Sequence, residues 1–348
     1  MSDIEIRIEG RAGRITLNRP KALNALTYPM CLEIEAALDR WRADNAVALV
    51  LIDAAGDKAF CAGGDIAVMY ETGTKGDYAY GQKFWRDEYR MNAKIAEYPK
   101  PVVSLMQGFT MGGGVGVGCH GSHRVVGETS QVAMPECGIG LVPDVGGSLI
   151  LARAPGRLGE YLGTTGRRMG PGDAIYAGFA DHFVPEADWP GLVADLVATG
   201  EVDAIESAAQ TPQRGDLPPL QGQVDRLFAG ETLRDVVSAL TADRTDFAAD
   251  TLNRLSRGSP LAIACTIEMQ HRLGPGATIR SALALEYRFT HRAPEHSDFL
   301  EGIRAAIIDK DKAPNWRHAG LASVPLADVA AMLAPLGPDE LNLEEDGQ

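Results

Sequence analysis

The sequence predicts an α/β core followed by a helical C-terminal region. Over roughly residues 1–185, apolar runs typical of strands alternate with segments that carry a helical apolar face. After about residue 188 the strand patterns stop and helical patterns continue. The chain has 348 residues, which exceeds the usual size of one domain. We therefore predict a core over residues 1–187 and a helical region over residues 188–348.

The first elements follow from local patterns. Residues 4–8 and 14–17 alternate apolar and polar side chains on either side of a glycine turn, as half-buried strands do. Thr27 can cap a helix whose apolar residues share one face. These residues are Met30, Ile34, Ala37, Leu38 and Trp41. Residues 46–52 form a continuous apolar run, which indicates a strand buried on both faces.

The middle of the chain repeats this alternation. A long helix is predicted over residues 77–97, after a shorter one, and a buried strand over residues 101–106. Strands at 123–127 and 131–134 follow a glycine-rich segment. Further on, prolines and polar residues at 210–220 indicate a linker within the helical region.

Composition narrows the class of partner. The formal net charge of -14 argues against nucleic acid or an anionic membrane surface as the main partner. The chain has no run of about 18 apolar residues, and residues 1–5 lack the basic and apolar regions of a signal peptide. The five cysteines form no C-x-x-C pair, so a disulfide framework is not expected. These observations favour a cytoplasmic protein, and an anionic small-molecule substrate would need a local basic patch.

Two glycine-rich segments can bring backbone N–H groups close to a ligand. The first, residues 58–65, ends in Gly-Gly-Asp, where Asp65 can cap the next helix; alone, this pattern is more often a simple turn. In residues 108–118, a helix beginning near Gly113 would direct free N–H groups at a ligand oxygen, with tight helix packing as the alternative. Residues 116–121 match G-x-G-x-x-G, but the strand that follows leaves no room for the helix of a dinucleotide site.

Glu136 and Asp144 each follow a proline, a short distance beyond these glycines. Prolines and glycines between them exclude one continuous helix, so both acids are expected on loops. A single carboxylate is more often a solvated surface charge. Acyl transfer at a thioester or ester, however, needs donors for an oxyanion and a carboxylate that attacks or deprotonates. The combination of glycines and acids therefore points to that chemistry.

Other candidates carry weaker signals. His120 and His123 are three residues apart, but no acidic or cysteine partner stands at a standard spacing, so no metal site is predicted. Cys137 has no obvious histidine base and is interpreted as a buried thiol. Glu88 lies in the predicted helix 77–97, and nothing local separates it from an ordinary helix charge.

These segments resemble the crotonase (enoyl-CoA hydratase/isomerase) superfamily, and the resemblance covers nearly the whole chain. Segments 17–26 and 62–66 mark the superfamily in general. The pieces that match a thioester-hydrolase branch are Met111-Gly112-Gly113-Gly114-Val115-Gly116, Pro143-Asp144-Val145-Gly146-Gly147 and Ile308-Asp309-Lys310-Asp311. The resemblance implies a crotonase-like spiral of ββα units with a helical C-terminal region that covers the acyl pocket. It also implies that the thioester oxygen meets the N–H groups of Gly64 and Gly113.

For the acids, the resemblance implies distinct roles. Glu136 takes the second of two glutamate positions used by hydratases, while Gly116 stands at the first. Asp144 takes the position of the second acid of the hydrolase branch, and Glu88 matches a further substrate-site position of that branch. The implied activity is hydrolysis of short 3-hydroxyacyl-CoA thioesters. An enoyl-CoA hydratase or isomerase using Glu136 alone is the first alternative, and a non-catalytic acyl-CoA-binding scaffold is the second.

The resemblance also bears on cofactors and assembly. No metal and no separate cofactor are expected, because coenzyme A is part of the substrate. Members of the family often form trimers or hexamers, so a homo-oligomer is an open expectation for this chain.

Overall fold

The structure is a computed structural model and describes residues 2–343. Contacts divide the chain into two compact units, each built from three segments. The first, which we call the sheet unit, consists of Met1–Asp65, Arg90–Ala133 and Arg168–Pro218. The second, which we call the helical unit, consists of Ile66–Tyr89, Met134–Arg167 and Pro219–Gln348. Contacts and sequence character thus divide the chain differently, and the boundary at residue 187 stays a prediction.

A six-stranded sheet forms the centre of the sheet unit. Its strands, in chain order, are β1 (Ile4–Glu9), β2 (Ala12–Leu17), β3 (Leu49–Ala54), β5 (Val102–Met106), β7 (His123–Val126) and β9 (His182–Phe183). They lie in the order β1-β2-β3-β5-β7-β9; only the β1–β2 pair is antiparallel. Strands β3 and β5 are almost fully buried, as their continuous apolar runs predict.

A second, smaller sheet carries the glycine-rich segments. It consists of β4 (Ala59–Cys61), β6 (Phe109–Met111) and β8 (Gln131–Ala133), all parallel, in the order β4-β6-β8. Parallel strands end at the same edge of a sheet, so the chain that follows β4 and the chain that follows β6 emerge side by side.

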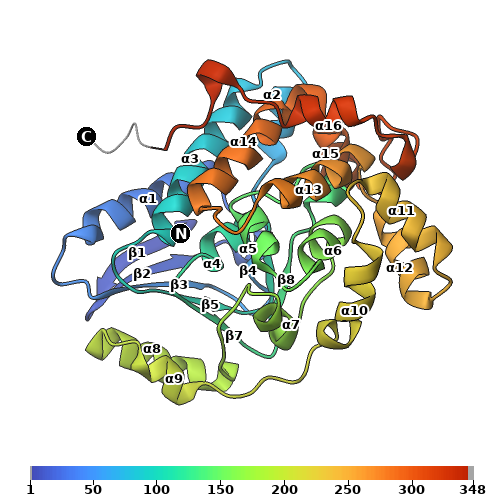
Figure 1. Cartoon of the computed structure of the whole chain (residues 1–348). Helices are drawn as coiled ribbons and strands as arrows, with labels where there is room; N and C mark the ends of the chain where they lie inside the picture. Colours follow the sequence, from blue (N-terminus) through green and yellow to red (C-terminus); the bar gives the residue numbers. More distant parts are fainter. Residues whose placement is uncertain (1, 344–348) are drawn as a thin grey trace. The chain divides into compact units, whose positions relative to one another are not determined.

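Helices pack around the two sheets within the same unit. They are α1 (Tyr28–Arg42), α4 (Gly113–Gly118), α7 (Pro171–Tyr176), α8 (Trp189–Thr199) and α9 (Asp203–Ala208). Thr27 caps α1 by accepting a hydrogen bond from the N–H of Met30, as predicted. Leu192 and Leu196 of α8 pack with Leu51 and Val103 in one core cluster. In Figure 1, α8 and α9 lie together along one side of the strands.

The helical unit contains no strand among its described residues. Its helices are α2 (Ala67–Gly73), the first part of α3 (Ala79–Ala96), α5 (Gly147–Arg153), α6 (Leu158–Thr165), α10 (Leu217–Leu227), α11 (Leu233–Ala242), α12 (Asp246–Leu255), α13 (Pro260–Arg272), α14 (Ile279–His296), α15 (Phe299–Ile303) and α16 (Leu326–Met332), with a single-turn 3-10 helix η2 (Glu136–Ile139). The predicted helical character beyond residue 188 is confirmed.

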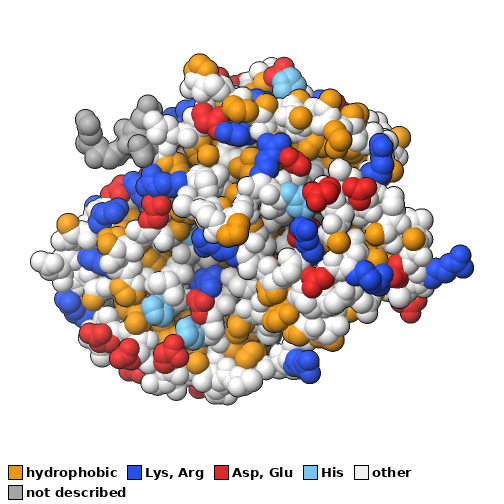
Figure 2. All heavy atoms as spheres, in the orientation of Figure 1, with side chains coloured by type: hydrophobic (Ala, Val, Ile, Leu, Met, Phe, Trp, Pro, Cys, Tyr) orange, Lys and Arg blue, Asp and Glu red, His pale blue; other side chains and the backbone are white. Residues whose placement is uncertain are grey.

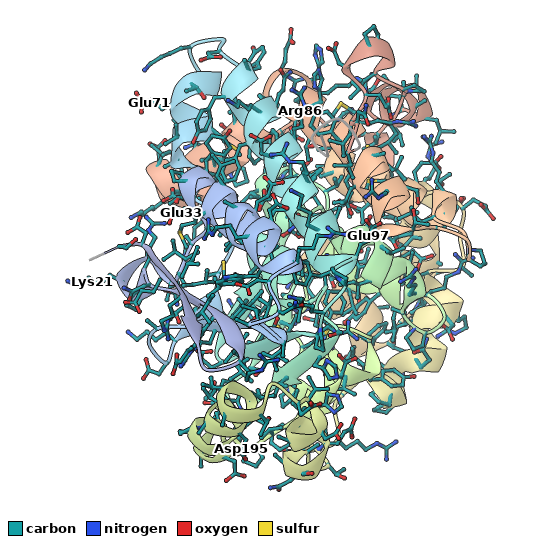
Figure 3. The ribbon with its side chains drawn as sticks, turned by 90° about the vertical axis from the view of Figure 1, so that its left-hand side faces the viewer. Lys21, Glu33, Glu71, Arg86, Glu97 and Asp195 are labelled. Carbon is teal, nitrogen blue, oxygen red and sulfur yellow. The ribbon has the colours of Figure 1, made fainter. Side chains whose placement is uncertain are left out.

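The first part of α3 packs beside α14. Gln82 donates a hydrogen bond from its side-chain amide to the carbonyl of His291 at 3.2 Å. Arg86, which Figure 3 labels, donates to the hydroxyl of Tyr287 at 3.2 Å. The rings of Tyr89 and Tyr287 meet edge to face, with centroids 6.2 Å apart. These contacts fix the rotation of α3 about its axis, and so the direction in which Glu88 and Tyr89 point.

The surface shows no concentration of one charge on the face drawn in Figure 2, where acidic and basic side chains are interspersed. Within the described part of the chain, helices are too short or too polar to cross a membrane.

Candidate active site

The register of the small sheet brings Gly64 and Gly113 to one edge. Cys61 of β4 pairs with Thr110 of β6, and each glycine lies three residues beyond its paired residue. Gly64 forms a parallel bridge with Leu26, whose hydrogen bonds run through the carbonyl of Gly63 and the N–H of Asp65. The N–H of Gly64 takes no part in that bridge.

Helix α4 begins at Gly113, as the sequence predicts. The first N–H groups of a helix have no partner inside the helix. Gly114 explains why the segment needs glycine: a Cβ there would lie only 2.1 Å from the carbonyl oxygen of Cys61. The start of α4 therefore packs directly on the end of β4, and the glycine-rich sequence makes this approach sterically allowed.

Asp65 does not cap a helix. The predicted cap is wrong, because α2 begins after Ile66 and has no side-chain cap. The carboxylate of Asp65 instead accepts a hydrogen bond from the guanidinium of Arg19 at 3.0 Å. This pair links the loop after β4 to the loop after β2 within the sheet unit.

The three predicted acids all lie in the helical unit and are all buried: Glu88 on α3, Glu136 at the start of η2, and Asp144 in the turn before α5. Asp144 lies on a loop, as predicted from the surrounding prolines and glycines, whereas Glu136 begins the single-turn 3-10 helix η2 rather than a loop. Asp144 accepts a hydrogen bond from the hydroxyl of Tyr89 at 2.8 Å. Because Tyr89 is the residue after Glu88, helix α3 contributes both an acid and the hydroxyl that contacts a second acid.

Burial makes ionisation of these acids unfavourable. It raises the pKa of Glu88 and the pKa of Glu136 well above their ordinary range, and the charge of Asp144 raises both further. Burial also raises the pKa of Asp144 itself to about 7, although the hydrogen bond from Tyr89 acts in the opposite direction. Several carboxyl groups with raised pKa values in one cluster are typical of sites that move protons.

Two carboxyl oxygens in this cluster have no hydrogen-bond partner among the described residues. They are Oε1 of Glu88 and Oε2 of Glu136, both fully enclosed. Buried polar atoms in native proteins are almost always satisfied, by protein, water or ligand. These two oxygens are therefore the atoms of the cluster that are ready to contact a substrate or an ordered water.

Sequence reasoning missed two members of the cluster, Tyr89 and Glu286. Glu286 lies on α14, has no exposed surface, and interacts electrostatically with Asp144 and Glu136. Burial raises the pKa of Glu286 to about 8, and the hydrogen bond from the Ser148 hydroxyl opposes that rise. In the sequence it resembles an ordinary helix charge; only the three-dimensional contact with residues 146 and 148 distinguishes it.

Two of the weaker candidates, His123 and Cys137, behave as structural residues. The ring of His123 stacks on that of His182 at 6.3 Å. Among residues 2–343, no group of three or more His, Cys, Asp or Glu side chains is arranged to hold a metal ion. Cys137 is buried, its Sγ lies 3.3 Å from the hydroxyl of Thr266, and burial raises its pKa to about 12. This confirms its interpretation as a buried thiol rather than a nucleophile.

The structure thus brings the predicted residues together in two groups: Gly64 with Gly113 in the sheet unit, and Glu88, Glu136 and Asp144 in the helical unit. The first group offers N–H donors and the second offers buried acids.

Residues 12–333 match the enoyl-CoA hydratase/isomerase family, and the chain belongs to that family. The match spans both the glycine segments and the acids.

Within the family, its curated relatives include 3-hydroxyisobutyryl-CoA hydrolase, mitochondrial, from several vertebrates. The Danio rerio protein is 39% identical over 98% of this chain and 92% of its own length. The Homo sapiens protein of the same name is 37% identical over 97% of this chain and 90% of its own length.

Two solved structures share the crotonase-type fold along nearly the whole chain. One, described as an enoyl-CoA hydratase from Rhodobacter sphaeroides, is 61% identical with a TM-score of 0.94, covering 98% of this chain and 100% of that one. The other, described as a carnitinyl-CoA dehydratase from Mycobacterium thermoresistibile, is 41% identical with a TM-score of 0.94 and full coverage of both chains (100%). The predicted fold class is confirmed.

Proposed function

We propose that this protein hydrolyses 3-hydroxyisobutyryl-CoA, and related short 3-hydroxyacyl-CoA thioesters, to the free acid and coenzyme A. The observation that carries the proposal is the enclosed group of Glu88, Glu136 and Asp144, in which two carboxyl oxygens lack partners. Relatives that match nearly the whole chain and bear the name of this hydrolase support the choice of substrate.

In this proposal the N–H groups of Gly64 and Gly113 donate to the thioester oxygen. A tetrahedral intermediate concentrates negative charge on that oxygen, and fixed donors stabilise the charge more than they stabilise the ground state. The paired ends of β4 and β6 support this role, because they hold both glycines at one sheet edge without reorganisation.

Glu136 would supply the attacking group in one of two ways. As a nucleophile, its carboxylate adds to the carbonyl carbon, the C–S bond breaks, the thiolate of coenzyme A leaves, and water then hydrolyses the resulting anhydride. As a general base, it removes a proton from a water molecule that attacks the same carbon. Burial makes its carboxylate form a stronger base and nucleophile than a solvated one, but it also favours the protonated form, so either role begins with loss of the Glu136 proton.

Asp144 and Glu88 would hold the 3-hydroxyl group of the substrate and a water molecule. The free oxygen of Glu88 supports this assignment, as does the neighbouring hydroxyl of Tyr89, which keeps Asp144 in one orientation. A site built to hydrogen-bond a hydroxyl discriminates strongly against an analogue that lacks it. We therefore expect faster hydrolysis of 3-hydroxyacyl-CoA than of the matching plain acyl-CoA.

The second candidate function is hydration or isomerisation of enoyl-CoA. The description of the Rhodobacter sphaeroides structure, at 61% identity, favours it. Adding water across a double bond needs a base for the water and an acid for the α-carbon. The position of the first hydratase glutamate is Gly116, which lies inside α4 and offers no carboxylate. Hydrolysis needs only one carboxylate beside the oxyanion donors, so it is the simpler use of these residues.

One experiment separates the two activities. The protein is incubated with 3-hydroxyisobutyryl-CoA in the presence of a thiol reagent, and with crotonyl-CoA while the enoyl absorbance is followed. The proposal predicts release of free coenzyme A from the first substrate and little loss of absorbance from the second. Rapid loss of enoyl absorbance without free thiol would establish the second function instead. Trapping with hydroxylamine then distinguishes an anhydride from direct attack by water.

We further propose a role in valine breakdown, a cytoplasmic location, and no need for a metal or separate cofactor. The vertebrate relatives carry "mitochondrial" in their names, so fractionation of the native organism's cells is the test of location. Assays in the presence of a chelator test the expected independence from metals. A homo-oligomer remains a proposal, which the mass of the protein in solution decides.

A further inference from the structure

Glu286 forms an unusual contact with the backbone around Asp144. One oxygen of its buried carboxylate accepts a hydrogen bond from the N–H of Gly146 at 2.8 Å. The other accepts from the N–H of Ser148 at 3.1 Å and from the Ser148 hydroxyl. Helix α5 has Gly146 as its N-cap residue and therefore no cap from its own side chains. Glu286 supplies that cap from α14, 140 residues further along the chain.

The turn that Glu286 holds is strained. Val145 has φ 53° and Gly146 has φ 79°, and the N–H of Gly147 donates to the carbonyl of Asp144 at 2.7 Å. This is the geometry of a type I′ turn, which strongly favours glycine or asparagine at both central positions. A buried β-branched residue at positive φ is a genuine outlier and persists only where the surroundings enforce it. The hydrogen bonds that Glu286 accepts from Gly146 and Ser148 restrain the backbone directly after Val145.

Helix α14 also contacts Tyr89, the hydrogen-bond donor to the carboxylate of Asp144. Tyr89, whose hydroxyl donates to the carboxylate of Asp144, lies 3.4 Å from the hydroxyl of Thr290. Thr290 is one helical turn after Glu286, so both side chains project from the same face of α14. One helix therefore holds the backbone of the turn through Glu286 and the partner of the Asp144 carboxylate through Thr290.

We propose that Glu286 is a positioning residue, whose carboxylate keeps the Val145–Gly146 turn in its strained form and thereby aims Asp144 at the 3-hydroxyl of the substrate. This inference rests on the proposed function, in which Asp144 binds that hydroxyl. It assigns Glu286 no contact with substrate. The positioning role follows from its hydrogen bonds, because both carboxylate oxygens of Glu286 already accept from groups of Gly146 and Ser148.

The test begins with Glu286→Gln. The amide keeps the shape of the carboxyl group but replaces one acceptor by a donor, which faces a backbone N–H of the turn. Without that restraint Val145 can relax, and a displacement of about 1 Å at a substrate-binding group can cost roughly 10²-fold in rate. We expect kcat/KM for 3-hydroxyisobutyryl-CoA to fall by about this factor, while kcat/KM for isobutyryl-CoA, which lacks the hydroxyl, changes little.

A double-mutant cycle with Asp144→Asn distinguishes positioning from a general structural role. If Glu286 acts through Asp144, adding Glu286→Gln to Asp144→Asn should cost little more, because the group being positioned is already altered. If the losses in kcat/KM of the two single variants add fully in the double variant, the inference is overturned. A folded Glu286→Gln protein with wild-type selectivity would overturn it too. Ser148→Ala removes only the hydroxyl donor, and should shift selectivity in the same direction by less. It keeps the inference testable if Glu286→Gln does not fold.

Asp298→Asn is the matched control. Asp298 is also a buried carboxylate of the helical unit that accepts from a serine hydroxyl, that of Ser259 at 2.6 Å, and from a backbone N–H, that of Arg317 at 2.8 Å. Its substitution should lower the melting temperature without changing the ratio between the two substrates. A wild-type protein that releases no coenzyme A would refute the proposed function and this inference with it. An active wild type with unaltered selectivity after Glu286→Gln would refute the inference alone.

Discussion

Replacing Asp144 by asparagine should stabilise the protein above neutral pH, although it impairs the proposed activity. Burial raises the pKa of Asp144 from its ordinary 3.8 to about 7. An unfolded chain therefore releases this proton at lower pH than the folded protein does. Between these two pKa values the folded state binds more protons, so stability falls as pH rises. Asparagine carries no charge, and its side-chain oxygen can still accept from the hydroxyl of Tyr89.

The size of the effect follows from the shift. About three pKa units at roughly 1.36 kcal/mol each give a penalty of about 4 kcal/mol, fully present above about pH 7. At pH 5 the penalty is only about 1–2 kcal/mol. The free energy of unfolding of Asp144→Asn relative to wild type should therefore increase by about 2–3 kcal/mol between pH 5 and pH 8. With an unfolding entropy of about 2.1 cal/mol/K per residue, this corresponds to about 4 °C in Tm. Removing the Asp144 charge also eases ionisation of Glu88 and Glu136, which acts in the same direction.

Thermal unfolding of both proteins at pH 5, 6, 7 and 8 measures this gain directly. Glu35→Gln is a control of opposite sign: although burial acts to raise it, hydrogen bonds from Arg90 and Lys94 lower the pKa of Glu35. That carboxylate contributes stability above its unfolded pKa, so its loss should destabilise the protein at pH 8. A difference in Tm between Asp144→Asn and wild type that stays constant from pH 5 to pH 8 would refute the reasoning.

Three further outcomes are expected. Glu136→Gln should keep the fold and lower kcat by about 10²–10⁴, measured as coenzyme A release; near-normal turnover would exclude the assigned role. Gly114→Ala should lower stability by about 1–3 kcal/mol and impair activity, because its Cβ would meet the carbonyl oxygen of Cys61 at 2.1 Å; an unchanged denaturation midpoint would contradict this packing. Tyr89→Phe removes a hydrogen bond that lowers the pKa of Asp144, so the pH profile of kcat/KM should move to higher pH; an identical profile would show that this bond does not tune the acid.

Much of the fold could be predicted because it is encoded locally. The cap at Thr27, the apolar face of α1 and the buried run of β5 each depend on neighbouring residues. The start of β3 was predicted three residues too early, at residue 46 rather than 49. The reason is not local: Lys100 donates hydrogen bonds to the carbonyls of Trp41, Asp44 and Val47, and so holds this apolar stretch as a turn.

The predicted linker shows a similar limit. Helix α10 begins at Leu217, inside the segment 210–220 that its prolines mark as a break. Proline is tolerated in the first turn of a helix, where its missing N–H would have no partner in any case. Pro218 and Pro219 therefore lie in the first turn of α10, and the linker ends before Leu217 rather than at residue 220.

The residues of the candidate site also divide into those that local sequence predicts and those that it does not. Gly113, Glu136 and Asp144 could be predicted as site residues from the sequence, because glycines and prolines next to them determine the backbone conformation there. The part played by Glu286 was not visible. Its partners are backbone N–H groups 140 and 138 positions earlier, and backbone groups leave no mark in a sequence. Contacts between a helix side chain and a distant backbone can therefore be identified only from the tertiary structure.

Asp144 and Glu286 are both buried, yet their substitution should have opposite effects on stability. Burial raises both pKa values, that of Glu286 to about 8. The difference lies in the hydrogen bonds that each accepts. Asp144 accepts one from the Tyr89 hydroxyl, which asparagine preserves, and one from a backbone N–H. Glu286 accepts three, of which glutamine cannot preserve all. A buried N–H left without an acceptor costs about 1–3 kcal/mol, so Glu286→Gln should lower Tm at pH 7. A rise in Tm for both variants would show that relief of buried charge outweighs the loss of the cap, and that the turn holds its strained form without Glu286.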